Sequence, residues 1–487
     1  MDKKFRTYLR CYFLTILLLG CFKIYGQVKL DGILDLPIGQ VERIFHIITA
    51  DKNGLILYRE TTELEETTVR TWEILLLNTE LEVQWSTSLK SEYSFQLNSI
   101  CADEISFYLL FKNQSSSKKE IKIYQIDFSS KNFVVIPVKT FVPKKINYFK
   151  VVSNTIVLGG SEKGKPAIVF YPKLSDRPVI LQGIFGKKGK VLDIFHDSEN
   201  NICTILYQYR NIDGNWSVAV KSYDYTGKII EDTNIEPDGL VQIKDARTRI
   251  SGDRRIVAGT YYRRGNSAVN GYFSAVISPH GTYDLELFPL NTLNVKDISL
   301  SDTTYNIADS VVEKRIPDKY EHMLVRELQT HNGQLLLLTE TMNPNDLNSK
   351  AREKSGGKVR FIKGAISSFN RKGALLWHNE YMMSGYYSEL YPSLTKMEGR
   401  NDTIITFIYY RKSIAEQKLF DGELVSGYSY TDLELMDFYD EFDKESLNVH
   451  NEIRAWYGSH YLFISMMKDP ETFENLTMLS LRKLKIE

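Results

Sequence analysis

One local pattern recurs eight times along the chain: a short polar turn runs directly into a stretch rich in β-branched and aromatic residues. The turns are Asn53-Gly54, Asp103-Glu104, Ser153-Asn154, Glu199-Asn200, Gly252-Asp253, Asn332-Gly333, Asn401-Asp402 and Gly458-Ser459. The repeats are spaced by roughly 45 to 80 residues, and most contain no helical pattern, which is typical of propeller blades. We therefore predict an all-β chain that forms a single β-propeller, with eight blades as first choice and seven as second.

The expected repeat contains three strands. The apolar strand after the polar turn is followed by a variable loop, a strand of alternating pattern, a tight turn and a third strand. In the fourth repeat the alternation places Trp216, Val218 and Val220 on every other position, as a strand with two unlike faces requires. Aromatic residues make up 12% of the chain, and we expect most of them to pack between adjacent blades.

The two ends of the chain are predicted to meet. The last repeat stops at Glu487 without a third strand, whereas Gln27 to Leu36 form an alternating stretch that has no partner of its own. An open ring would leave two sheet edges free to aggregate. We therefore predict that the N-terminal strand completes the last blade and closes the ring.

Three segments are too long for simple connections. The segment 292–323 lacks a strand pattern over most of its length and is interpreted as an insertion between blades, partly helical. Segment 343–358 is polar, basic and punctuated by glycine, and segment 435–449 is acidic. Long loops on a rigid scaffold commonly carry binding specificity.

The first 26 residues have the form of an export signal, with a basic start and an apolar core from Tyr12 to Phe22 that is short for a membrane span. Cleavage after Gly26 would leave residues 27–487 as the mature propeller. Cleavage before Cys21 is the alternative, because Leu18 to Cys21 is similar to the lipobox of bacterial lipoproteins, and a lipid would then sit on Cys21. Either product is predicted to leave the cytoplasm for the periplasm or the periplasmic side of the outer membrane.

The charge balance excludes one class of partner, and the cysteine content limits the possible disulfides. Loss of residues 1–26 would remove five basic side chains and one acidic one, leaving 56 basic residues against 60 acidic ones. This balance excludes nucleic acid as an expected partner, since phosphates require a basic face. Cys101 and Cys203 would remain in an oxidising compartment; we expect two separately buried thiols, with a disulfide as the alternative.

Two stretches carry a resemblance to a known family. The hairpin ends in Phe369 to Trp377 and in Tyr223 to Asp232 resemble the blade signature of quinoprotein-like and WD40-like propellers, a group that includes eight-bladed scaffold lipoproteins of outer-membrane assembly. The resemblance implies that a tryptophan later in the strand docks onto the next blade; Trp377 fits this best and Trp85 more loosely. It does not extend to quinone binding. The aromatic and lysine-rich composition also resembles exported proteins of Bacteroidota.

A search for catalytic chemistry finds no motif. The eight histidines are scattered, without HExxH or paired metal-ligand spacing, and neither a G-x-S-x-G elbow nor a Walker loop occurs. We predict a protein that is not an enzyme and that needs no cofactor or metal.

An acidic segment is the first candidate binding site. It contains Asp437, Asp440, Glu441 and Asp443, with aromatic residues interleaved. A solvated loop, a docking segment for a basic partner, and a calcium or catalytic carboxylate site all remain open. The absence of glycine between Asp437 and Glu445 argues against a calcium loop.

Two runs of tyrosine and basic residues are the second candidate. The runs comprise Tyr261, Tyr262, Arg263 and Arg264 in the fifth repeat, and Tyr409, Tyr410, Arg411 and Lys412 in the seventh. Both stand where the apolar strand enters its loop, so a ring places them on the same face. Tyrosine and arginine are favoured at interaction hot spots, although ordinary strand ends are the alternative.

Two functions remain. The first is a non-catalytic scaffold that binds another envelope protein, as part of a protein export or outer-membrane assembly machine. The second is a carbohydrate-binding or glycan-active propeller, which carboxylates converging at the ring axis would favour.

Overall fold

The computed structural model describes most of the chain after the first 27 residues. The described residues are 28–38, 43, 45–61, 69–114, 120–138, 143–152, 154–173, 177–184, 188–212, 214, 216–265, 268–293, 296–298, 322–343, 359–387, 395–410, 413–434, 450–468 and 477–486. The predicted export signal, its two cleavage sites and Cys21 therefore lie outside the described residues.

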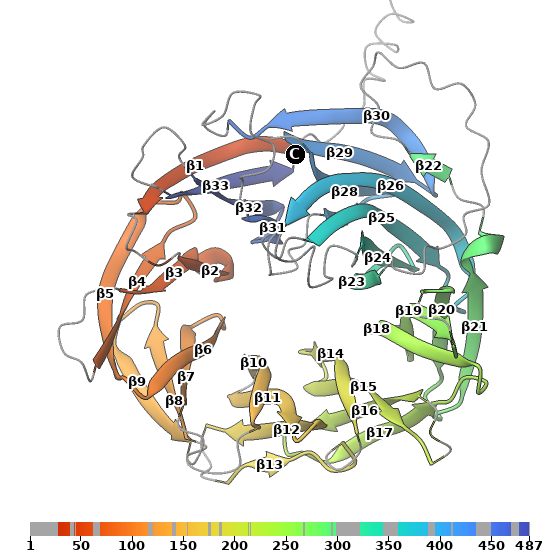
Figure 1. Cartoon of the computed structure of the whole chain (residues 1–487), viewed down its shortest axis with the longest axis horizontal. Helices are drawn as coiled ribbons and strands as arrows, with labels where there is room; N and C mark the ends of the chain where they lie inside the picture. The colour runs from red at the N-terminus through yellow and green to blue at the C-terminus, as the bar shows by residue number, and fades with distance from the viewer. Residues whose placement is uncertain are drawn as a thin grey trace, which may run out of the picture.

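Eight antiparallel sheets surround a common axis (Figure 1). Counting strands from the axis outward, blade 1 holds β2 (His46–Thr49), β3 (Leu55–Glu60), β4 (Val69–Leu77) and β5 (Val83–Glu92). Blade 2 holds β6 (Phe95–Ala102), β7 (Ser106–Asn113), β8 (Ile121–Asp127) and β9 (Phe133–Val138). Blade 3 holds β10 (Lys145–Val152), β11 (Thr155–Glu162), β12 (Lys165–Pro172) and β13 (Val179–Ile180). Blade 4 holds β14 (Gly189–Asp197), β15 (Ile202–Arg210), β16 (Trp216–Asp224) and β17 (Ile229–Ile235).

The second half of the ring repeats this order. Blade 5 holds β18 (Val241–Ser251), β19 (Arg254–Arg263), β20 (Gly271–Ile277) and β21 (Tyr283–Pro289). Blade 6 holds β23 (His322–His331), β24 (Gln334–Asn343), β25 (Val359–Phe369) and β26 (Leu375–Tyr387). Blade 7 holds β27 (Thr395–Arg400), β28 (Thr403–Tyr410), β29 (Ser413–Phe420) and β30 (Glu423–Asp432). Blade 8 holds β31 (His450–Ala455), β32 (His460–Lys468), β33 (Thr477–Ile486) and, from the other end of the chain, β1 (Val28–Ile38).

The predicted eight-bladed propeller and its mode of closure are confirmed. Strand β1 pairs antiparallel with β33 over its whole length, from Val28 opposite Ile486 to Ile38 opposite Thr477. Figure 1 shows the two strands side by side although they come from opposite ends of the chain. The outer strand of blade 8 thus comes from the N-terminal side of the chain.

The expected three-strand repeat was wrong by one strand. Each polar turn joins the strand nearest the axis to the second strand of the same blade, so every blade has an innermost strand before its turn. In blade 2, for example, Asp103 accepts hydrogen bonds from the backbone N–H groups of Ile105 (2.9 Å) and Ser106 (2.7 Å) and fixes this turn. Cys101, which precedes the polar turn of its repeat, lies inside the innermost strand β6.

A β-bulge hides these innermost strands from pattern analysis. In blades 2 to 6 the register of the first strand slips by one residue near its start. In β18 the buried positions Val241 and Ile243 are followed by Ala246 and Thr248, because Lys244 is the extra residue. Since a bulge inserts one residue into the ladder, the two-residue alternation changes phase and no longer predicts a strand.

The core is divided among the junctions between blades. Eight clusters of buried apolar side chains each combine residues of two neighbouring blades, including the junction of blade 8 with blade 1. Central strands are therefore covered on both faces: in β16 every residue from Ser217 to Tyr223 is buried. The unlike faces expected for this strand were wrong, because a neighbouring blade packs on either side.

Both cysteines are buried inside strands, and the predicted insertion contributes one further strand. Cys101 and Cys203 are free and buried, as predicted, and burial raises the pKa of both thiols to about 12. Within the segment 292–323, Lys296–Ile298 forms β22, a fifth strand that pairs parallel to β26. A short 3₁₀ turn precedes it at Leu290–Thr292 and another occurs at Asp51–Asn53. In the described part of the chain no helix is long and apolar enough to span a membrane.

Candidate functional site

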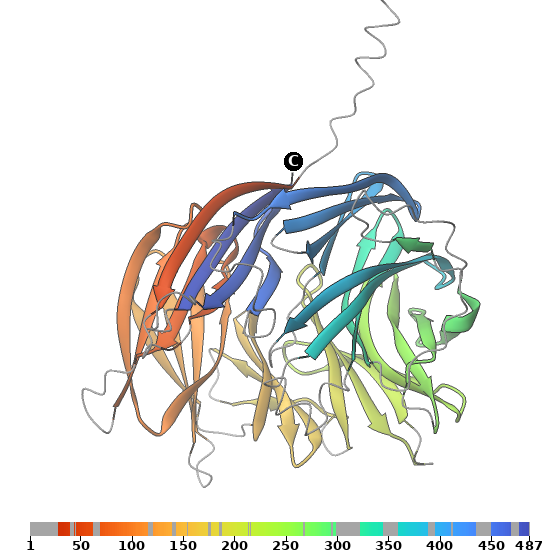
Figure 2. The same ribbon diagram turned by 45° about the horizontal axis from the view of Figure 1, so that its top comes forward.

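The antiparallel order gives the ring two faces that carry different connections, and the strands run between these faces (Figure 2). One face carries the turns that join the first strand to the second and the third to the fourth; in blade 5 these are the turns at Gly252 and Gly281. We call it the turn face. The opposite face carries the connections from second to third strand and from blade to blade, as at Arg264. We call it the loop face.

All three long segments are attached to the loop face. Their flanking strand ends are Pro289 and His322 around the first, Asn343 and Val359 around the second, and Asp432 and His450 around the third. Each flanking end belongs to a connection between blades or between second and third strands. Most of the first segment and nearly all of the other two lie outside the described residues.

The predicted tyrosine and arginine run of blade 5 divides between core and surface. Tyr261 is only 1% exposed and packs in the cluster between blades 4 and 5, so its side chain belongs to the core. The alternation of the strand explains this, since Tyr262 points to the other side and is half-buried. Burial raises the pKa of Tyr262, and the Lys244 ammonium lies 5.4 Å from its ring centre. Arg263 and Arg264 are exposed on the loop face.

The other predicted site residues are placed only in part. Tyr409 and Tyr410 end β28, the second strand of blade 7, and thus occupy the place in the blade that Tyr261 and Tyr262 reach in blade 5. The side chains of both, together with Arg411, lie outside the described residues. The same holds for the four acidic candidates, which are Asp437, Asp440, Glu441 and Asp443. Their roles in binding stay predictions.

A cavity of about 400 Å³ opens on the loop face between blades 3 and 4. Its walls come from the starts of β10 and β14, the end of β11 and the turn before β12, with one side chain from blade 5. The lining residues that carry polar side chains are Asn147, Tyr148, Ser161, Lys190, Asp193 and Arg247. Pattern analysis missed these residues because most of them lie on innermost strands or their bulges, which the phase change conceals.

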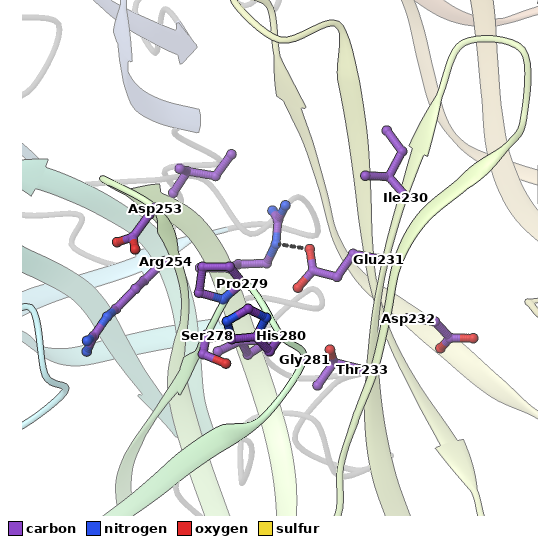
Figure 3. Close-up of a pocket in the computed structure, with 13 residues that line it drawn as sticks. Ile230, Glu231, Asp232, Thr233, Asp253, Arg254, Ser278, Pro279, His280 and Gly281 are labelled. Carbon is purple, nitrogen blue, oxygen red and sulfur yellow. Dashed lines mark hydrogen bonds and ion pairs between the residues drawn. The ribbon is translucent and has the colours of Figure 1, made fainter.

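A second cavity of about 400 Å³ lies on the turn face between blades 4 and 5 (Figure 3). It lies between β17 and the two turns of blade 5. The Nε of Arg255 donates to Glu231 Oε2 at 2.8 Å, the contact that is dashed in Figure 3. Arg255 Nη1 and Thr233 Oγ1 are buried without a hydrogen-bond partner in the described structure. His280 and Pro279, both exposed, stand at the mouth.

Two carboxylates of innermost strands, Asp193 and Asp245, are engaged in bonds between blades. Asp193 of blade 4 accepts the backbone N–H of Thr248 in blade 5 at 3.0 Å, and Asp245 of blade 5 accepts that of Val325 in blade 6 at 3.2 Å. Burial raises the pKa of Asp193, while the Thr248 amide and neighbouring arginines oppose the shift. These carboxylates satisfy backbone donors that would otherwise be unpaired.

One serine, histidine and glutamate group is enclosed. Ser367 Oγ lies 2.9 Å from His378 Nδ1, and His378 Nε2 lies 3.5 Å from Glu380 Oε1. Ser367 is fully buried and His378 is 3% exposed, so a substrate has no access to either side chain. Among the described residues, no three His, Cys, Asp or Glu side chains are placed to hold a metal ion.

Comparison with known proteins yields fold similarity alone. No family model and no curated protein matches the chain. Solved structures that match include Sqt1 from Chaetomium thermophilum (10% identity, 93% of this chain and 99% of that chain, TM-score 0.44) and the polysaccharide lyase Uly1 (9%, 93% and 99%, 0.40). A prolyl endopeptidase structure also matches, with 11% identity over 90% of this chain and 55% of that chain and a TM-score of 0.39. The present chain therefore spans about half the length of that endopeptidase. Such low identities and TM-scores support no argument about activity.

Proposed function

We propose that this propeller is a non-catalytic scaffold that holds another protein of the cell envelope on its loop face. One observation carries the proposal: the chain leaves and re-enters the ring at the loop face for all three of its long segments. Binding specificity is commonly placed in long connections on a rigid scaffold. A partner seated on this face would reach all three at once.

Two exposed arginines and one half-buried tyrosine lie on the same face. Arg263 and Arg264 are exposed at the end of β19, beside the half-buried Tyr262. Arginine can form bidentate contacts with carboxylates, and tyrosine offers apolar area with one polar group, which makes both frequent at interface centres.

The envelope location rests on the predicted export signal, and the resemblance to outer-membrane assembly scaffolds suggests the class of partner. We therefore propose a component of a protein export or outer-membrane assembly machine. The glycan-active alternative needs free carboxylates near the axis. It receives less support, because Asp193 and Asp245 bond to the backbone of the neighbouring blade.

The test is recovery of the partner. The full-length protein, tagged and expressed in its own cells, would be purified from solubilised envelope and analysed by quantitative mass spectrometry. We expect an envelope protein at about one copy per propeller. A monomer that recovers no envelope protein, and whose melting temperature rises with added saccharides, would contradict the scaffold and favour the glycan-binding alternative.

A further inference from the structure

The loop-face cavity between blades 3 and 4 has the size of a small-molecule site. Its volume of about 400 Å³ lies within the range of roughly 300 to 1,000 Å³ of ordinary ligand pockets. Four glycines lie in its wall, Gly159, Gly160, Gly164 and Gly189, and of these only Gly164 has open space where a side chain would begin. Asn147, exposed on the bulge of β10, and Ser161 at the end of β11 supply neutral hydrogen-bonding groups.

Two cationic side chains that line this cavity keep unused donors. The side chain of Lys190 is exposed and forms no hydrogen bond or ion pair with any described residue, so its ammonium retains three donors. Arg247 donates hydrogen bonds through Nη1 only. The acceptors are the carbonyl oxygens of Leu192 (3.0 Å) and Ala246 (2.9 Å) and Asp245 Oδ1 (3.2 Å). Within the described structure its Nε and Nη2 make no such bonds. The guanidinium is therefore held in place with donors to spare.

The surroundings are positively charged. Lys244 lies close enough to act on Lys190: the pKa of Lys190 is lowered mainly by desolvation and further by Lys244 and Arg247, while Asp245 opposes the shift. Lys190 is nevertheless exposed to solvent, as expected for a side chain that faces an enclosed, water-accessible space.

The acidic residue in the wall does not cancel this charge. Asp193 lines the cavity, but its Oδ2 accepts the Thr248 amide and lies 3.6 Å from Arg249 Nη1. The charged side chains that line the cavity are Lys190 and Arg247 against Asp193. With the neighbours Lys244 and Arg249, and Asp245 and Glu327, the set is four cations against three carboxylates. A concave site with surplus charge of one sign attracts ions of the other sign.

We propose that this cavity binds a small ligand through an oxyanion group, a phosphate, sulfate or carboxylate, which Lys190 and Arg247 hold. Hydrogen bonds to an ionised group are about twice as strong as neutral ones, and a fixed guanidinium suits two oxygens of one anion. Asn147 and Ser161 would bind the neutral part of the ligand. The cavity opens on the same face as the proposed partner surface, but its residues differ from Tyr262, Arg263 and Arg264, so this proposal does not depend on the scaffold proposal.

Isothermal titration of the full mature protein tests the proposal, first with inorganic phosphate and sulfate at constant ionic strength set with chloride. We expect one site with a dissociation constant on the order of 1 mM or tighter. Titrations with glucose 6-phosphate and with citrate then show whether a phosphate or a carboxylate is preferred. Glucose and glycerol are the uncharged controls for these two ligands. If neither the inorganic anions, glucose 6-phosphate nor citrate binds, the proposal is wrong.

Matched variants separate a built site from diffuse attraction. Lys190→Gln should weaken binding of the best anion at least about tenfold, whereas Lys190→Arg should retain it. Lys150→Gln is the control, because Lys150 is an exposed lysine on β10 that does not line the cavity. Equal losses for Lys190→Gln and Lys150→Gln, or none for Lys190→Gln, would overturn the assignment. The envelope pull-down of Lys190→Gln should still recover the partner, so this proposal and the scaffold proposal can fail separately.

Discussion

Arg482 of β33 and Asp35 of β1 form a bidentate ion pair across the closure of the ring, with Nη1 to Oδ1 at 2.7 Å and Nη2 to Oδ2 at 3.2 Å. Arg482 is fully buried. Its Nε and Nη2 also donate to the carbonyl oxygens of Leu433 (2.7 Å) and Glu434 (3.0 Å) at the end of blade 7. One guanidinium therefore links both termini and the preceding blade.

The first prediction concerns this ion pair. Arg482→Met should lower the free energy of unfolding by about 3 to 5 kcal/mol, because it leaves Asp35 and two carbonyl groups without their donor. Lys122→Met is the control, since the Lys122 and Glu92 side chains of this ion pair are 31% and 67% exposed and the pair should contribute less than about 1 kcal/mol. Urea unfolding measures both. Similar midpoints for the two variants would show that the buried pair does not hold the closure.

The second prediction concerns pH. His196 Nε2 lies 2.6 Å from the Tyr148 hydroxyl and Nδ1 lies 2.9 Å from the Tyr225 hydroxyl. Burial lowers the pKa of His196 to about 4, with a smaller contribution from Lys150. Because the unfolded chain takes up this proton near pH 6.5, the stability contributed by neutral His196 is complete above that pH and declines as the pH falls toward 4.

Unfolding midpoints at several pH values test the effect of His196. Between about pH 7.5 and about pH 5 this group should cost about 2 kcal/mol of stability. The His196→Gln variant should lose less stability between these pH values than the wild type, although the variant should be less stable than the wild type at neutral pH. A variant that keeps the full pH slope would show that other groups cause it.

The third prediction concerns contact between neighbouring blades. The ring of Trp377 in blade 6 lies against Gly422 in a turn of blade 7, and a Cβ added there would approach Trp377 Cγ to 2.5 Å. This agrees with the docking that the family resemblance implied for Trp377. Gly422→Ala should cost about 2 to 4 kcal/mol, from the positive φ and the displaced ring. Gly252→Ala is the control: Gly252 also has a positive φ but has open space around it, so this change should cost only about 1 kcal/mol. Equal losses of melting temperature in the two variants would exclude a stabilising contact between Trp377 and Gly422.

The fourth prediction concerns the proposed partner surface. Replacing Arg263 and Arg264 together by alanine should reduce recovery of the partner at least about tenfold while leaving stability unchanged, because both side chains are exposed. Arg371 and Lys372, an exposed basic pair on the turn face, provide the control double variant. Quantitative pull-down compares them. A loss of partner in the turn-face variant alone would place the interface on the wrong side of the ring.

The number of blades and their closure were predictable because each repeat keeps one strong signal, a polar turn followed by an apolar strand. The innermost strands were not, since bulged residues such as Lys244 and Arg326 shift the alternation by one position. Local pattern also could not predict β22, whose parallel partner β26 is distant in sequence.

Candidate site residues were predictable only as strand ends. The run at Tyr261 was placed correctly in the blade, but which of two adjacent tyrosines faces the core depends on strand register, and Tyr261 proved to be the buried one. The loop-face cavity was missed because it needs residues from three consecutive blades, such as Asn147, Lys190 and Arg247, which only the packing of neighbouring blades brings together.

The turn face and the loop face both require that the ring is closed by the pairing of β1 with β33. Lys29 of β1 lies opposite Lys485 of β33, within the Cα separation of about 4.4 to 6.8 Å that a disulfide requires. In the double variant Lys29→Cys and Lys485→Cys, mild oxidation should produce an intramolecular disulfide between residues 29 and 485, identified by peptide mass spectrometry and accompanied by a higher melting temperature. Free thiols at both positions after oxidation, or links only between separate molecules, would contradict the closed propeller.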